Sequence, residues 1–166
     1  VIERDGHLTQ DESVTISAEF LLANDIDPDG DTLTVESVAA RSEYGAVITF
    51  DDGVITYDAS QSSDLQELAA AQTVTDWFYY TISDGKGGTS TAKVTLSISG
   101  LNDAPHDLAF DASNNLDDAE GGLGVRGSRT LGHVAAIDPD TNDTVTYSLG
   151  SGSSAGFTLS GGGTLK

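Results

Sequence analysis

The sequence predicts an all-β protein built as a β-sandwich, and two observations lead to that prediction. Short runs of alternating apolar and polar residues recur along the chain, and they are rich in threonine, valine, isoleucine and tyrosine, as half-buried strands are. Joints rich in glycine and aspartate separate these runs, and many short strands joined in this way are typical of a sandwich. Before the middle of the chain we predict strands at residues 13–16, 33–36, 47–50 and 54–57, and a later one at 94–98.

One segment favours a helix instead. Residues 63–71 place Leu65, Leu68 and Ala69 at helical spacing. A run of four aromatic residues, 77–80, has the alternation of a strand, and we expect one alternate pair to fill the core. If the other pair faces solvent, it could form a platform on which a sugar stacks.

A joint at residues 100–105 divides the chain into two predicted domains, 1–104 and 105–166. Pro105 fixes its own backbone there and biases Ala104 toward extended geometry. The segment after it, 107–129, is rich in glycine and acidic residues. Strands are predicted again only at residues 134–137, 145–147 and 157–159, which are too few to close a sandwich, so we expect the second domain to be a truncated one.

The charge of the chain restricts its partners. With 27 acidic and 7 basic residues the net charge is -20, so the compact state repels itself unless cations neutralise part of that charge. Nucleic acid and anionic membrane surfaces are therefore not expected partners. The sequence has no cysteine, which excludes disulfides and thiolate metal sites, and it has no apolar run long enough to predict a membrane span.

The most informative segment is residues 24–31, where four aspartates fall on alternate positions of a turn. Six to eight oxygen ligands are what Ca²⁺ prefers, whereas Mg²⁺ demands tighter octahedral geometry and keeps its waters. We therefore predict a Ca²⁺ site here. The alternative is a solvated acidic turn, because aspartate and glycine are ordinary turn residues. The four predicted ligands are Asp25, Asp27, Asp29 and Asp31.

Residues 25–36 also satisfy the formula of an EF-hand loop, with Gly30 at the sixth place and Glu36 at the twelfth. We do not expect its helices, because Leu33 and Val35 alternate with polar residues as in a strand.

Further acidic clusters lie where predicted strands end, and in a sandwich such residues gather at the poles. Each of them taken singly could equally be an ordinary turn. The segment Asp27-Pro28-Asp29 has a counterpart in Asp138-Pro139-Asp140, which indicates an array with one kind of loop repeated. The clusters contain Asp84, Asn102 with Asp103, and Asp138 and Asp140 with Asp143 nearby.

Three separated motifs resemble one family. LLANDIDPDGDTLTV at residues 21–35, DWFYYTISDGKGG at 76–88 and LNDAP at 101–105 are similar to the VCBS and bacterial cadherin-like repeats of large RTX-type adhesins. The resemblance covers about residues 1–105 and is looser from 106 to 166. It implies a Greek-key, immunoglobulin-like (cadherin-like) β-sandwich, followed by the first part of a second one.

The resemblance also implies ligand roles. Cadherins hold Ca²⁺ between domains, so Asn102 and Asp103 would act with Asp138 and Asp140 at one junction. Gly100 stands where cadherins place an aspartate, and the motif Leu-Asp-Arg-Glu is missing, which puts the number of ions in doubt. At the preceding junction the implied ligands are Glu3, Asp27, Asp29 and Asp84.

The expected function is that of a calcium-binding extender in an extracellular adhesin, secreted or on the bacterial surface, whose partners are the neighbouring tandem domains. The alternatives are a carbohydrate-binding module, a homophilic adhesion module, or an accessory domain of a secreted polysaccharide-degrading enzyme. We do not expect catalysis by this chain. Residues 152–156 match the nucleophile-elbow formula and 122–127 the dinucleotide fingerprint, but neither leads into a predicted helix, and the three histidines are scattered.

Overall fold

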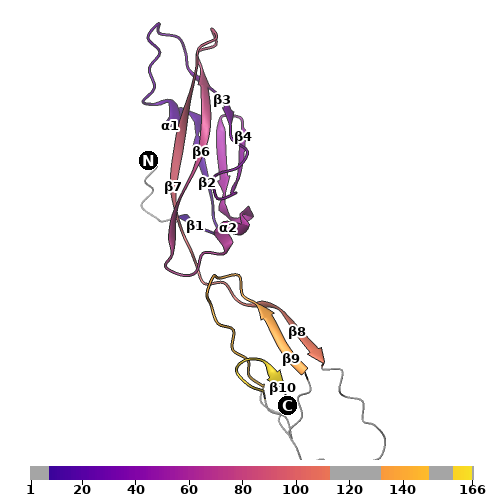
Figure 1. Cartoon of the computed structure of the whole chain (residues 1–166). Coiled ribbons are helices and arrows are strands. Elements are labelled where there is room, and N and C mark those ends of the chain that lie inside the picture. The colour runs from indigo at the N-terminus through magenta and orange to yellow at the C-terminus, as the bar shows by residue number, and fades with distance from the viewer. Residues whose placement is uncertain (1–7, 113–131, 150–158, 166) are drawn as a thin grey trace, which may run out of the picture. The chain divides into compact units, whose positions relative to one another are not determined.

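The computed structural model describes residues 8–112, 132–149 and 159–165. Its contacts divide the chain into two compact units, Val1–Asn102 and Asp103–Lys166. In both units the described segments are mainly β-strands (Figure 1). The rejected motifs at residues 122–127 and 152–156 lie outside the described residues.

The described part of the first unit forms two sheets, one of four strands and one of three. All pairings are antiparallel except that of β1 with β7, which is parallel. The five strands predicted in this part of the sequence are confirmed. The larger sheet has the order β1 (Leu8–Thr9), β7 (Thr89–Ser99), β6 (Thr73–Ser83) and β3 (Thr34–Val38), and the smaller has β2 (Ser13–Ser17), β5 (Val54–Asp58) and β4 (Val47–Asp51).

The core lies between the two sheets, because alternate residues of each strand point inward. Burying each large apolar side chain stabilises the fold by about 1.5 to 3 kcal/mol. Tyr57 from the smaller sheet stacks on Phe78 from the larger, with ring centroids 6.3 Å apart. The predicted β-sandwich is thus confirmed. Its fully buried centre includes Ile55, Tyr57, Leu65, Phe78 and Ile98.

The aromatic run on β6 divides between the two faces of its sheet. Phe78 and Tyr80 are buried, which confirms that one pair fills the core. Tyr79 faces outward and is 53% exposed, and the Lys93 ammonium lies 5.3 Å from the centroid of the Trp77 ring. Since Lys93 already contacts Trp77, Tyr79 is the more accessible ring of the outward pair. Sugar binding by this pair stays a prediction.

One charged residue lies inside this core. The Asp76 side chain is 0% exposed and accepts three hydrogen bonds. The Tyr57 hydroxyl donates to Oδ2 at 2.6 Å, while the backbone N–H groups of Tyr44 and Trp77 donate to Oδ1 at 3.0 and 2.8 Å. Burial, and then the hydrogen bond and charge of Asp76, raise the pKa of Tyr57. Asp76 therefore joins the two sheets to the segment between β3 and β4.

The predicted helix at residues 63–71 is shorter than expected. The structure has η1 (Ala59–Gln61) followed by α2 (Ser63–Gln66), whose first turn is capped by Ser62 accepting from the N–H of Leu65. Beyond its end the N–H of Leu68 donates to the Leu65 carbonyl, and the side chain of Gln72 accepts from the N–H of Ala69. A second short helix, α1 (Ala18–Leu22), was not predicted, and its N-cap is Ser17.

The described part of the second unit contains a three-stranded sheet in the order β10 (Thr164–Leu165), β9 (Gly132–Ile137) and β8 (His106–Ala112). β9 confirms the strand predicted at 134–137. The strand predicted at 145–147 is wrong, since that segment is irregular and the Tyr147 hydroxyl accepts from the N–H of Ala136. β8 was missed, and of the strand predicted at 157–159 only Leu159 is described.

Candidate metal centres

The acidic loop of the first unit, residues 24–31, connects α1 with β3. Asp27 organises it, since its Oδ1 accepts from the backbone N–H groups of Asp29 at 2.9 Å and Asp31 at 3.1 Å. Gly30 closes the turn with a φ of 81°, a conformation that costs glycine little. The loop therefore runs from a five-residue helix into a strand, so the EF-hand architecture is not formed.

A second loop, residues 84–88, connects β6 with β7. Asp84 holds it in the same way, because its Oδ1 accepts from the N–H groups of Lys86 at 2.7 Å and Gly88 at 2.9 Å. Gly88 allows this close approach, since a Cβ at that position would lie 2.3 Å from the Oδ2 of Asp84. Both loops are thus shaped by an aspartate that binds the backbone of its own turn.

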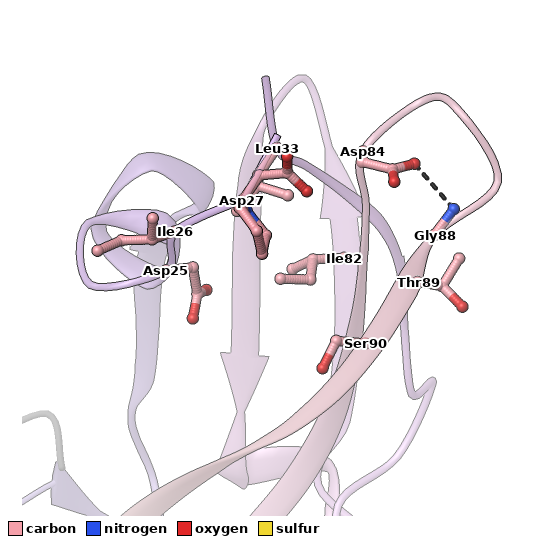
Figure 2. A pocket seen from close by; sticks show the side chains of 10 residues that line it. Asp25, Ile26, Asp27, Leu33, Ile82, Asp84, Gly88, Thr89 and Ser90 are labelled. Atoms are coloured by element: carbon pink, nitrogen blue, oxygen red, sulfur yellow. Dashed lines mark hydrogen bonds between the residues drawn. The ribbon is translucent and has the colours of Figure 1, made fainter. Parts of the chain in front are cut away.

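A pocket of about 300 Å³ lies between these two loops. In Figure 2 Asp27 and Asp84 stand on opposite sides of it, with Ile82 between them and Asp25 farther from the tip of the 84–88 loop. The Oδ2 of Asp25 is buried without a hydrogen-bond partner. Burial, and then the negative charge of Asp25, raise the pKa of nearby Tyr80. The pocket is therefore a region of negative potential beside an apolar wall.

The structure distributes the predicted ligands of the first unit over different places. Asp25, Asp27 and Asp84 line the pocket, whereas Asp29 and Asp31 do not. Asn102 follows the last strand, β7, which begins at the pocket and runs for 11 residues, or roughly 35 Å, to the other end of the domain. Glu3 lies outside the described residues.

Replacing Gly88 by alanine tests whether Asp84 holds its loop. The added Cβ would displace the Asp84 carboxylate and break its bonds to two backbone N–H groups, so we expect a loss of about 1 to 2 kcal/mol in the free energy of unfolding. Urea denaturation followed by tryptophan fluorescence measures this. Asp84→Ala should cost a similar amount, and the double variant little more, because both changes remove the same bonds. Fully additive losses would contradict this interpretation.

The second unit brings three carboxylates together in the loop after β9. Oxygen atoms of Asp138, Asp140 and Asp143 all lie within 4.8 Å of one another, and this is the one group of its kind within the described ranges. The N–H of Asp140 donates to Asp138 Oδ1 at 3.1 Å, and the N–H of Asp143 donates to the Asp140 carbonyl at 3.2 Å. Asp143, which the sequence grouped with the pair without counting it as a ligand, completes the group.

Asp140 is the central member of this group. Its side chain is only 3% exposed, and its Oδ2 accepts from the N–H of Asp103 at 2.7 Å. Its Oδ1 is buried without a hydrogen-bond partner. A buried carboxylate oxygen without a donor is costly, and a bound cation removes that cost. Three carboxylates at this spacing are oxygen ligands of the kind that Ca²⁺ takes, with waters or carbonyls filling its remaining positions.

The first unit is an all-β sandwich with aspartate-rich loops at the ends of its strands, and cadherin-like modules share this sandwich architecture. Residues 2–100 match the family described as bacterial cadherin-like domain, and the chain belongs to this family. No curated protein matches the chain. No helix among the described residues is both long and apolar enough to cross a membrane.

Asp76 is the residue whose role the sequence analysis missed. It occupies an inward position of its strand together with Phe78 and Tyr80, and that parity predicts a buried carboxylate once the strand is recognised.

Proposed function

We propose that this chain is a calcium-binding extender module of a bacterial adhesin, secreted or displayed on the cell surface, and that its partners are neighbouring domains of the same protein. Membership of the bacterial cadherin-like family supports an adhesive, structural role. The observation that carries calcium binding is the group of Asp138, Asp140 and Asp143, in which a buried carboxylate oxygen lacks a partner.

The proposed ion acts by neutralising charge. Three carboxylates within 4.8 Å repel one another, and no Lys or Arg in the described part of the chain pairs with them. The whole chain has a net charge of -20, so repulsion between negative charges disfavours its folded state as well. A cation that binds the folded state and not the unfolded one therefore stabilises the module by mass action.

The pocket of the first unit is a second position at which we propose an ion, with Asp25, Asp27 and Asp84 as candidate ligands. Their oxygens do not form a group within 4.8 Å. An ion there therefore requires the two loops to approach each other, or further ligands from a neighbouring domain. For this reason we propose the loop with Asp138, Asp140 and Asp143 as the primary calcium site.

Isothermal titration calorimetry tests the proposal. We expect the chain to bind Ca²⁺, and the Asp143→Asn variant to lose one tight site or to weaken it about tenfold or more, because affinity follows the number of charged ligands. Asp111→Asn is the matched control, since it removes the same charge from an exposed position on β8. Calcium binding that is the same in all three proteins would refute the assignment, as would an absence of binding.

A further inference from the structure

The outward side of β6 and β7 is rich in hydroxyl groups. The two strands pair in antiparallel register along all 11 residues of each. Because alternate residues of a strand point to opposite faces, the buried side chain of Phe78 fixes which residues face outward. Apart from Trp77, Tyr79 and Lys93, every residue on this outward side is threonine or serine. We call this side of the two strands the outer strip.

The outer strip contains no carboxylate. The chain has a net charge of -20, yet Lys93 supplies the one charge among the outward residues of β6 and β7. Two acidic residues lie along the border of the strip toward β3: Glu36 in the bulge, and Glu43, whose N–H donates to the Trp77 carbonyl at 2.9 Å. A neutral ligand therefore meets no carboxylate on the strip itself, whereas the charge of the whole chain repels a polyanion.

Tyr79 and Lys93 form the centre of the strip, because they are direct partners across the two strands. The Tyr79 side chain is 53% exposed. The Lys93 ammonium lies 5.3 Å from the centroid of the Trp77 ring, and this cation–π contact limits where its N–H donors can point. Trp77 and Tyr79 are two positions apart, roughly 7 Å along the strand. An accessible ring thus stands beside a cation that is held in place.

Threonine hydroxyl groups flank this centre on both sides. In one direction the next outward pair is Thr81 with Thr91, whose Oγ1 atoms share a hydrogen bond of 3.1 Å. In the other direction Thr95 is paired with Trp77. A hydroxyl group has one donor and two acceptor positions, so these side chains keep hydrogen-bonding capacity toward a ligand. Ligands that themselves carry many hydroxyl groups match this surface.

We propose that the outer strip binds a neutral glycan chain whose pyranose rings carry equatorial hydroxyl groups, such as a β-1,4-linked glucan, xylan or chitin chain. Such a ring has a flat face of C–H groups, which packs on an aromatic ring, and hydroxyl groups at its edge. Tyr79 stacks on one sugar ring, Lys93 donates to a sugar oxygen, and the flanking threonines contact the hydroxyl groups of neighbouring rings.

A glycan fits the strip better than a protein partner does. Protein interfaces bury an apolar centre, and the strip offers only the two rings of Trp77 and Tyr79 among hydroxyl groups. The inference does not depend on the calcium binding proposed above, because the strip contains none of the candidate calcium ligands.

An NMR titration of the whole chain with soluble oligosaccharides tests the proposal. The neutral probes are cellohexaose, xylohexaose and chitohexaose, and oligogalacturonate is the acidic control. We expect at least one neutral probe to produce saturable shifts of amide resonances on β6 and β7, with a dissociation constant of about 1 mM or below. The acidic control should bind more weakly or not at all. Because no metal ligand lies on the strip, the same binding should be seen in EDTA.

Four variants assign the binding to named side chains. Tyr79→Ala should weaken it by at least about tenfold, whereas Tyr79→Phe keeps the ring and should bind within about twofold of the natural chain. Lys93→Met keeps an unbranched stem without the ammonium and should weaken binding by about fivefold. Phe20→Ala is the matched control, because it removes a 57% exposed ring from α1, and it should bind as the natural chain does. If Tyr79→Ala does not fold, Lys93→Met still tests the site.

Several outcomes would overturn the inference. One is that none of the neutral probes shifts the amides of β6 and β7. Another is that Tyr79→Ala and Phe20→Ala bind a probe equally well. Binding that disappears in EDTA, while the first unit stays folded, would place the glycan at the metal loops instead. Self-association that Tyr79→Ala abolishes, without binding of any probe, would make the strip an interface between copies of the chain. A failure of the chain to bind Ca²⁺ would leave the glycan site standing.

Discussion

Ca²⁺ at a hundredfold excess over its dissociation constant is expected to raise the unfolding midpoint of the second unit by roughly 10 to 20 °C. At that concentration an ion that binds only the folded state adds about 2.7 kcal/mol to stability. For a small domain each kcal/mol moves the midpoint by about 4 to 8 °C. The effect is large because the unit offers three mutually repelling carboxylates to the ion.

Calorimetric scans of the whole chain can separate the two units, because they are distinct compact units and need not unfold together. The chain has a single tryptophan, Trp77, and its fluorescence reports the first unit alone. Scans in Ca²⁺, in Mg²⁺ and in EDTA should show the rise with Ca²⁺ only, since Mg²⁺ requires closer octahedral geometry.

Two variants sharpen this measurement. Asp111→Asn should keep the calcium-dependent rise, and the double variant of Asp138→Asn with Asp143→Asn should lose it. A rise of equal size in Mg²⁺ would indicate general charge screening and would argue against a built site. A midpoint that does not change on adding Ca²⁺ would mean that the loop is a solvated acidic turn.

Replacing Asp76 by alanine is expected to lower the free energy of unfolding of the first unit by about 3 to 5 kcal/mol. The change leaves the hydroxyl of Tyr57 and the N–H groups of Tyr44 and Trp77 buried without their acceptor. It also opens a cavity between the sheets. Urea denaturation followed by tryptophan fluorescence measures the loss.

Tyr57→Phe and Tyr79→Phe form a matched pair of controls for this prediction. The first removes a hydroxyl bound to Asp76 in the core and should cost about 1.5 to 3 kcal/mol, as for a hydrogen bond to a charged group. The second removes a hydroxyl from a side chain that is 53% exposed and should change stability by less than about 0.5 kcal/mol. Equal effects of the two changes would show that the buried hydrogen bond contributes little.

The same pair predicts a dependence on alkaline pH. Because folding raises the pKa of Tyr57, its contribution to stability is complete below 10.0, the ordinary value for tyrosine, and declines as the pH rises beyond it. In the unfolded chain the hydroxyl ionises there, while in the fold it stays protonated beside Asp76. Between about pH 10 and 11 Tyr57→Phe should therefore lose less stability than the natural chain. Parallel losses would contradict this assignment.

The sandwich of the first unit was predictable because its strands carry the two-residue alternation along their whole length. β2 and β5 show this best, since Val14, Ile16, Ile55 and Tyr57 are buried while their neighbours are more exposed. The short helices were harder to predict, because they are defined by serine caps and side-chain bonds across one turn. Such caps look the same in a sequence whether the chain goes on to form a helix or a turn.

The second unit shows where local patterns fail. β8 carries aspartates at 107 and 111, which suggested a loop, yet it pairs with β9 through a bulge that follows His106. In the opposite sense, residues 145–147 have strand composition but no partner strand among the described residues. Strand formation depends on pairing with a distant segment, and composition does not contain that information.

For the candidate sites, the sequence predicted the loops better than the geometry within them. It grouped Asp138 and Asp140 with Asp143 nearby, and the structure brings the three carboxylates together and adds the bond from Asp103. Within residues 24–31 it treated four aspartates alike, but only Asp25 and Asp27 line the pocket. The ligand sets stay predictions, because burial and the direction of each carboxylate follow from tertiary contacts that alternation in a turn does not specify.

The parallel pairing of β1 with β7 determines how the first unit responds to mechanical force. Leu8 and Thr9 lie beside Ile98 and Ser99, so the first and last strands that the structure describes in this unit run side by side in the same direction. Tension applied to the two ends of the domain slides these strands past each other and loads their hydrogen bonds simultaneously, in shear. The N–H of Leu101 also donates a hydrogen bond to the side chain of the buried Gln10, which adds one further contact beside the paired strands β1 and β7. A module of this kind resists stretching along its length better than peeling from one edge. Stretching along the length is the load that a tether between a cell and a surface experiences.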